Sequence, residues 1–200
     1  RKPLYTYEFK EVAELMREMR KAAISIVIVL DEYGSTVGLI TLEDMLEDTD
    51  GVWLVLENVQ DPGNLGTMFR TGEGAGISGV IMDKCTVDIY NPKTIRSTMG
   101  SIFRVPFYIT EDLHGTLGQL QKKGIRVYAA HLEGSVCYDE PDYTGGTAFL
   151  IGNEGNGLTA ETAKLADTYI RIPMGGQLES LNAAMAAGIL MYEASRQRRG

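Results

Sequence analysis

Apolar residues in the second part of the chain fall into short aliphatic runs, separated by segments rich in helix-forming residues. Six of these runs predict strands, at residues 52–59, 79–83, 105–109, 125–130, 147–152 and 169–172. The intervening segments predict helices at 64–75, 91–101, 116–124, 153–166 and from Ala183 onward. Strands that alternate with helices predict an α/β fold, in which a mostly parallel sheet has helices on both faces.

The first fifty residues follow a different pattern. Residues 7–21 place apolar side chains on one face and predict an amphipathic helix, and residues 24–30 form a β-branched run. A turn at 31–36, a strand at 37–40 and a short helix at 42–48 are expected to follow. We therefore predict a small α+β segment over residues 1–50 and an α/β domain over residues 51–200.

Composition indicates a globular protein of the cytosol. Hydrophobic residues make up 44% of the 200 positions, and no uninterrupted apolar run of about 18 residues predicts a transmembrane helix. The first ten residues lack both an initiator Met and the apolar core of a signal peptide. Cys85 and Cys137 lie far apart without a second ligand at metal spacing, so we expect reduced thiols and no metal site.

The charge distribution argues against a protein that binds nucleic acid by electrostatics alone. The formal net charge is −8, with 19 basic and 27 acidic residues, and a large share of the excess lies in residues 1–50. A local basic patch is still available in the second part, from Arg70, Lys93, Arg96 and Arg104.

Three glycine-bearing polar stretches follow predicted strands. They read N-V-Q-D-P-G-N-L-G-T-M-F-R-T-G-E-G-A-G (58–76), F-L-I-G-N-E-G-N-G-L (149–158) and I-R-I-P-M-G-G-Q-L-E-S-L-N-A-A-M (170–185). The glycines of the first stretch end a helix, which argues against a dinucleotide-binding motif, and no glycine loop is followed by GK[ST]. Ligands of α/β proteins bind at such strand ends, although an ordinary strand–turn–helix with a capping serine also fits the third stretch.

Together the three stretches resemble the motifs of the SpoU (TrmH-type) RNA 2′-O-ribose methyltransferases of the SPOUT superfamily, from Val52 to the C-terminus. The resemblance implies a C-terminal trefoil knot, methylation of a ribose 2′-hydroxyl of rRNA or tRNA, and a homodimer. It also implies that S-adenosylmethionine binds at the matching positions Gly152, Ile172, Met174 and Leu181. We expect Gly152 to leave room for the base or ribose of that ligand, Ile172 and Leu181 to supply apolar walls, and Met174 to close over it.

The resemblance also implies the catalytic residues. Arg70 matches the arginine that the family uses to activate the hydroxyl. Because a guanidinium rarely gives up its proton, we expect Arg70 to bind a phosphate or a forming alkoxide. We expect Asn64 to orient Arg70 or the substrate, and Glu154 to pair with Arg70 or with a neighbouring chain. Ser180 and Asn182 match the polar pair of the third motif, and Ser180 is also a candidate helix cap.

Residues 29–48, V-L-D-E-Y-G-S-T-V-G-L-I-T-L-E-D-M-L-E-D, resemble a single CBS motif of CorC/HlyC type. CBS motifs normally bind adenine nucleotides in pairs, and only one is present here. Two alternatives to the methyltransferase therefore stay open. One is an adenine-nucleotide sensor, and the other is a natural or recombined fusion that binds S-adenosylmethionine without turnover.

Overall fold

The computed structural model describes residues 4–7, 27–30, 36–39, 49–133 and 136–199, in two compact units, Arg1–Glu47 and Asp48–Gly200. Three strands of the first unit form one sheet: β1 (Leu4–Tyr7), β2 (Val27–Leu30) and β3 (Thr36–Leu39). Strands β2 and β3 pair antiparallel, as the predicted strand–turn–strand order requires. Strand β1, which we did not predict, pairs parallel with β2. The predicted helices 7–21 and 42–48 lie largely outside the described residues.

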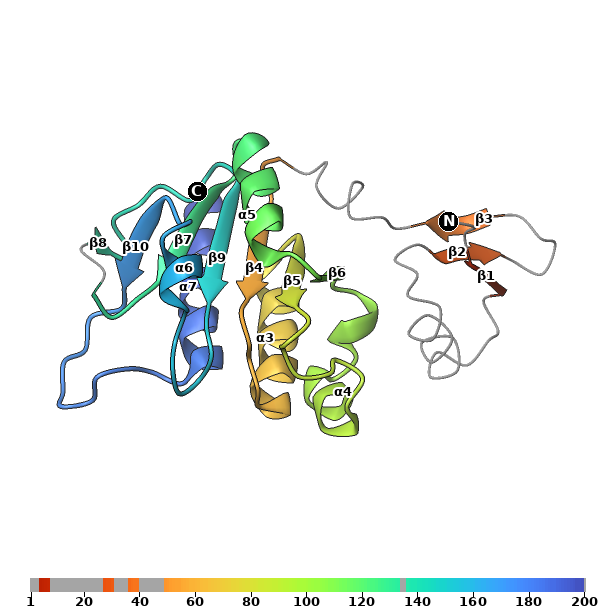
Figure 1. The fold of residues 1–200 in the computed structure, drawn as a ribbon, viewed down its shortest axis with the longest axis horizontal. Coiled ribbons are helices and arrows are strands. Elements are labelled where there is room, and N and C mark those ends of the chain that lie inside the picture. Colours follow the sequence, from red (N-terminus) through yellow and green to blue (C-terminus); the bar gives the residue numbers. More distant parts are fainter. Residues whose placement is uncertain (1–3, 8–26, 31–35, 40–48, 134–135, 200) are drawn as a thin grey trace. The chain divides into compact units, whose positions relative to one another are not determined.

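The second unit contains a seven-stranded sheet in the order β6-β5-β4-β9-β7-β10-β8 (Figure 1). Its strands are β4 (Val52–Leu56), β5 (Gly79–Asp83), β6 (Phe107–Thr110), β7 (Arg126–Ala130), β8 (Val136–Cys137), β9 (Thr147–Ile151) and β10 (Thr168–Arg171). Every neighbouring pair runs parallel, which confirms the predicted parallel sheet. The two-residue strand β8 is too short to leave a hydrophobic pattern and was not predicted.

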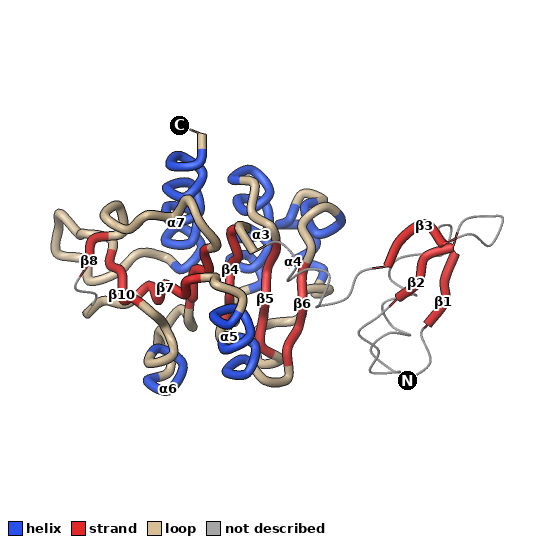
Figure 2. Tube along the Cα trace, turned by 90° about the horizontal axis from the view of Figure 1, so that it is seen from above, coloured by secondary structure: helices blue, strands red, loops and turns tan. Residues whose placement is uncertain are grey.

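Helices cover both faces of this sheet, as predicted. They are α3 (Pro62–Ala75), α4 (Pro92–Thr98), the 3₁₀ helix η1 (Ser101–Phe103), α5 (Leu113–Lys122), α6 (Ala160–Ala163) and α7 (Ala183–Arg198). Figure 2 shows α3, α4 and α7 on one face, and α5 and α6 on the other. The two central strands, β4 and β9, are therefore buried along their whole length.

The hydrophobic core lies between the central strands and the helices α3 and α7. Leu54 and Phe149 are fully buried in the sheet, and Met68 of α3 and Leu190 of α7 are fully buried against it. Strands β4 and β9 are in register, with residues 56 and 151 paired at their carboxyl ends. The loops that leave these two strands therefore start side by side at the middle of the sheet.

Two predicted helices are wrong in extent, because residues with positive φ interrupt them. Gly157 has φ +68°, and residues 153–158 form a turn, so that α6 begins only after its cap Thr159. Met99 and Gly100 have φ +50° and +88°, so the predicted helix 91–101 splits into α4 and η1. Helix α3 begins two residues before the predicted start, with Pro62 following the cap Asp61.

Candidate functional site

The three motif stretches meet at the carboxyl edge of the sheet. The carboxylate of Glu154, in the loop after β9, accepts hydrogen bonds from the backbone N–H groups of Gln60 (2.9 Å) and Asp61 (3.0 Å). It also accepts one from the side-chain amide of Asn64 (3.0 Å). Asn182, at the start of α7, donates from its amide to the side-chain oxygen of Asn64 (2.9 Å). One side chain from each stretch therefore belongs to a single hydrogen-bonded cluster, Glu154–Asn64–Asn182.

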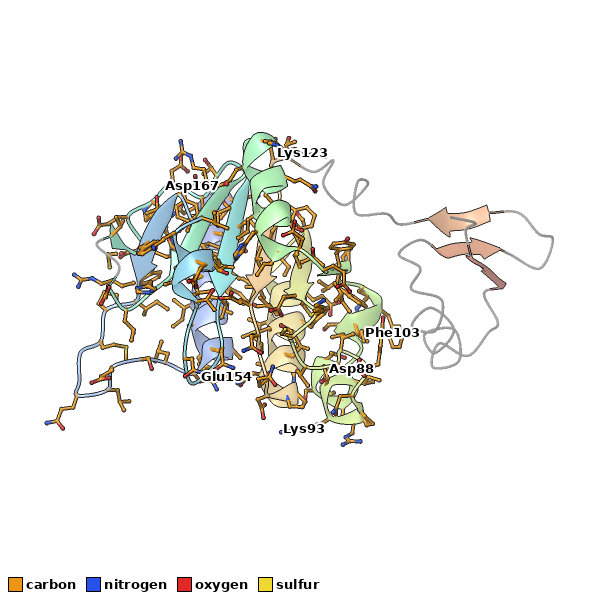
Figure 3. The ribbon with its side chains drawn as sticks, in the orientation of Figure 1. Asp88, Lys93, Phe103, Lys123, Glu154 and Asp167 are labelled. Carbon is orange, nitrogen blue, oxygen red and sulfur yellow. The ribbon has the colours of Figure 1, made fainter. Side chains whose placement is uncertain are left out.

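The hydrogen bonds to Glu154 favour its charged form. Partial burial acts to raise the pKa of this carboxyl, but the bonds from Asn64 and the two backbone N–H groups outweigh it and lower the pKa below the usual value. Asp61 behaves similarly, because the backbone N–H of Asn64 and the ammonium of Lys93 lower its pKa. Figure 3 shows Lys93 and Glu154 at this same edge. Both carboxylates are thus ionised and engaged with the chain itself at neutral pH.

Gly152 is required by the backbone of its own loop. A Cβ at this position would lie 2.2 Å from the carbonyl carbon of Gly157 and 2.3 Å from the nitrogen of Leu158. The side chain of Asn153 accepts hydrogen bonds from the N–H groups of Gly155 (2.9 Å) and Asn156 (3.0 Å), which closes the turn. The chain's own backbone, and not the predicted base or ribose, thus occupies the space left by the missing side chain.

The loop 173–181 is held differently. Within the described part of the chain, no hydrogen bond joins any of its residues to another group, and Ser180 is exposed. The cap of α7 is Asn182, whose side-chain oxygen accepts hydrogen bonds from the N–H groups of Ala184 (2.9 Å) and Met185 (3.2 Å). Ser180, the candidate cap from the sequence, does not cap this helix. Three cofactor candidates flank or belong to this loop and are half-buried: Ile172, Met174 and Leu181.

Arg70 is exposed on α3, and its side chain makes no hydrogen bond or ion pair with any described residue. The predicted pairing of Glu154 with Arg70 within one chain is not formed, since Glu154 bonds elsewhere. Asn64 binds Glu154 and Asn182 and does not orient Arg70. A charged guanidinium without a protein partner is free to bind an anionic group of a ligand.

Sequence reasoning missed Glu57, the residue that follows β4. This carboxylate is buried (8% exposed) and accepts hydrogen bonds from the backbone N–H of Thr159 (2.8 Å) and the hydroxyls of Thr159 (2.8 Å) and Thr162 (2.5 Å). Glu57 therefore fixes the start of α6, where the loop 152–158 ends. The available signal was a single charge inside the apolar run 52–59.

The described residues hold no group of three or more His, Cys, Asp or Glu side chains that is arranged to bind a metal ion. Nor does the described part of the chain include a helix long and apolar enough to cross a membrane. The site consists of amides, two carboxylates that the protein itself engages, one unpaired arginine and an exposed glycine loop. Such a set suits an organic ligand held by polar and backbone groups.

Residues 51–192 match the model of the SpoU rRNA Methylase family. The chain belongs to this family. Residues 1–49 match the model of the CBS domain. Both resemblances found in the sequence are therefore confirmed, and the SpoU match covers all nine site residues that we predicted.

Curated relatives carry names of ribosomal RNA methyltransferases. The 23S rRNA (guanosine(2553)-2′-O)-methyltransferase RlmP of Bacillus subtilis strain 168 is 40% identical over 139 residues, which cover 70% of this chain and 56% of that protein. The 23S rRNA (guanosine-2′-O-)-methyltransferase RlmB of Xanthomonas campestris pv. campestris is 34% identical over 161 residues, covering 80% of this chain and 65% of that protein. The chain thus spans between about half and two thirds of the length of these relatives.

Solved structures of SpoU methyltransferases share the fold. An AdoMet-bound rRNA methyltransferase from Sinorhizobium meliloti matches with TM-score 0.70 and 38% identity, covering 76% of this chain and 59% of that chain. The SpoU methyltransferase AviRb from Streptomyces viridochromogenes, in complex with AdoMet, matches with TM-score 0.74 and 26% identity, covering 98% of this chain and 83% of that chain.

Proposed function

We propose that this protein transfers a methyl group from S-adenosylmethionine to a ribose 2′-hydroxyl of ribosomal or transfer RNA. The observation that carries the proposal is the unpaired side chain of Arg70 on α3. In the first turn of this helix, Asn64 is hydrogen-bonded to Glu154 and Asn182, which belong to the two other motif stretches. The names of the relatives support an RNA ribose as the acceptor. An RNA of this kind lies in the cytoplasm, where we propose that the protein acts.

The residues at the carboxyl edge fit S-adenosylmethionine, which AdoMet-bound neighbours of the same fold contain. Ile172, Met174 and Leu181 are half-buried and suit the flat faces of an adenine. The backbone of 173–181 makes no hydrogen bond to the described chain and is available to the polar edges of the ligand. Gly152 contributes by allowing the turn 153–158 to fold tightly. When bound, the sulfonium supplies an activated methyl group.

The chain's own contribution to the transfer is positioning and charge. Arg70 carries a guanidinium charge, which stabilises negative charge that develops on the hydroxyl oxygen or binds a neighbouring phosphate. Asn64, Asn182 and Glu154 hold the loops around the reacting groups, and Ser180 offers a hydroxyl from the exposed loop. Correct placement of the two reactants is then a large part of the rate enhancement.

Substitution of Arg70 tests the proposal. Wild-type protein should transfer tritium-labelled methyl groups to 2′-hydroxyls of unmodified 23S rRNA transcribed in vitro. Arg70→Ala should lower kcat by about 100-fold or more, while calorimetry shows S-adenosylmethionine binding within about two-fold of wild type. Transfer that survives the substitution unchanged would remove Arg70 from the mechanism. Absence of both donor binding and transfer in the wild type would remove the function.

We propose that the C-terminal segment forms the trefoil knot implied by the family. After β10, near one side of the sheet, the chain returns through residues 172–182 to α7, which packs against α3, β4 and β9 (Figure 1). A crystal structure whose continuous backbone trace contains no knot would contradict this proposal.

We also propose a homodimer built on α7. Met185 and Tyr192 are large, 59% and 46% exposed, and seven residues apart on one helix face. A symmetric contact through this face would bury both. Sedimentation should give a dimer for the wild type and a monomer for Met185→Lys/Tyr192→Asp, and a monomeric wild type would contradict the proposal.

The CBS match of residues 1–49 favours one second candidate, the binding of an adenine nucleotide by the first unit. Separate calorimetric titrations with S-adenosylmethionine and with AMP or ATP distinguish the two. Saturable binding of the nucleotide without any binding of the methyl donor would move the function to residues 1–49.

A further inference from the structure

The segment formed by α4 and η1 combines exposed apolar side chains with basic ones. Ile95, Met99 and Phe103 are 39%, 68% and 64% exposed. Figure 3 shows Phe103 on the outer side of the segment. Residues 89–110 contain three basic side chains and no acidic one, although acidic residues outnumber basic ones in the whole chain. Apolar and basic groups interleaved in this way are typical of surfaces that bind single-stranded nucleic acid.

This surface lies beside Arg70. A Cβ on Gly66 would lie 2.4 Å from the Cβ of Ser97, so α3 and α4 cross closely at that point. Further along α3, the carboxylate of Glu73 accepts a hydrogen bond from the hydroxyl of Ser101 (2.5 Å) in η1. Positions 66, 70 and 73 share one face of a helix. Arg70 therefore lies between two contacts that join α3 to the α4–η1 segment.

Arg96 is the basic residue of the α4–η1 segment whose side chain has no ion-pair partner among the described residues. Lys93 forms an ion pair with Asp61 (3.2 Å), and Arg104 forms one with Glu73. Arg96 is exposed and makes no hydrogen bond or ion pair to any described side chain outside its own helix. Its guanidinium is therefore available to a phosphate on the same surface as Met99 and Phe103.

We propose that Ile95, Met99 and Phe103, together with Arg96, bind unpaired nucleotides of the RNA substrate next to the ribose held at Arg70. The inference rests on the proposed function and deepens it. Bases that leave a helix stack on exposed aromatic and apolar side chains, and an arginine holds the intervening phosphate. Continuity with Arg70 and the lack of acidic residues favour RNA over a protein partner on this surface.

Fluorescence anisotropy with a fluorescein-labelled twelve-nucleotide oligouridylate tests the surface directly. Phe103→Ala should weaken binding roughly ten-fold, and Phe103→Trp should retain it, because both aromatic side chains stack. Arg96→Ala should reduce the salt dependence of log K by about 0.7, the contribution of one phosphate contact to a single strand. The matched control is Leu132→Ala, since Leu132 is also 64% exposed but lies in the loop after β7. It should bind like the wild type.

Methyl transfer to the 23S rRNA transcript separates this inference from the proposed function. Phe103→Ala should raise KM for the RNA roughly ten-fold, with unchanged affinity for S-adenosylmethionine by calorimetry. If the wild type methylates RNA and Phe103→Ala has an unchanged KM, this inference alone is overturned. If Phe103→Ala changes the sedimentation of the protein without changing RNA binding, the surface contacts protein instead. A wild type that neither binds nor methylates RNA overturns both proposals.

Discussion

The loops 152–158 and 173–181 both contain glycines and both leave parallel strands at the carboxyl edge of one sheet, yet they are held in opposite ways. Asn153, Glu154 and the backbone of Gly157 bind the first loop to itself and to residues 58–64. The second loop makes no hydrogen bond within the described chain, and Leu178 is 72% exposed. Folding thus completes the first loop, and we infer that the ligand completes the second.

Matched glycine substitutions should give the largest contrast between the loops. Gly152→Ala places a Cβ within 2.3 Å of the backbone at 157–158, where nothing flexible is able to move aside. We expect a loss of about 3 kcal/mol or more in the free energy of unfolding, or no folded protein. A Cβ on Gly175 meets nothing within 4 Å, so Gly175→Ala should stay within about 0.5 kcal/mol. Equal midpoints of urea unfolding for Gly152→Ala and Gly175→Ala would contradict the claim that the two loops are held differently.

Glu57 supports the first loop at its C-terminal end, through Thr159 at the start of α6. Glu57→Ala removes a buried carboxylate and leaves the N–H of Thr159 and the hydroxyl of Thr162 without their acceptor. We expect a loss of about 2–3 kcal/mol in urea unfolding. The control is Glu161→Ala, because Glu161 is exposed on α6 and should change stability by less than about 0.5 kcal/mol. A Glu57→Ala variant as stable as this control would show that the network does not hold the loop.

Polar residues of the two loops should separate stability from ligand affinity. Glu154→Ala breaks three hydrogen bonds and should cost about 1–2 kcal/mol of folding free energy, reduced by the partial exposure of the group. Ser180→Ala should leave folding within about 0.5 kcal/mol and weaken S-adenosylmethionine binding several-fold in calorimetry. The comparison fails if Ser180→Ala destabilises the protein more than Glu154→Ala does.

The pH dependence of stability should carry a small contribution from the first loop. The pKa of Glu154 is lowered in the folded protein from the ordinary value of 4.5. Its charged form therefore stabilises the fold above pH 4.5, and this contribution is lost as pH falls through the lowered pKa. Urea unfolding of Glu154→Gln should lose less stability than the wild type between pH 6 and pH 3. Parallel curves for the two proteins would contradict the assignment.

Sequence patterns predicted the strands β4, β5, β7 and β9 well, because buried parallel strands are near-continuous apolar runs. The start of α7 at Ala183 was also predicted. The cluster Glu154–Asn64–Asn182 was predicted as three separate residues, and its hydrogen bonds were not. Contacts between residues 90 and 118 positions apart depend on the strand order, which no local pattern contains.

The errors at the site have local physical causes. Ser180 and Asn182 are both good helix caps, and only the backbone path decides which one precedes the first turn. Gly152 was interpreted as leaving room for a ligand, whereas its missing side chain accommodates the chain's own backbone at Gly157, which turns with positive φ. Glu57 was overlooked because the carboxylate is buried by Thr159 and Thr162, a hundred residues away in the sequence.

Hydrogen exchange measured by mass spectrometry, with and without S-adenosylmethionine, tests the central claim most directly. Without the donor, amides of 153–158 should exchange slowly and those of 173–181 fast, because only the first loop is hydrogen-bonded. Saturating donor should slow exchange across 173–181 at least ten-fold and leave 153–158 nearly unchanged. Unchanged exchange across 173–181 under saturating donor would contradict the account that the ligand completes this loop.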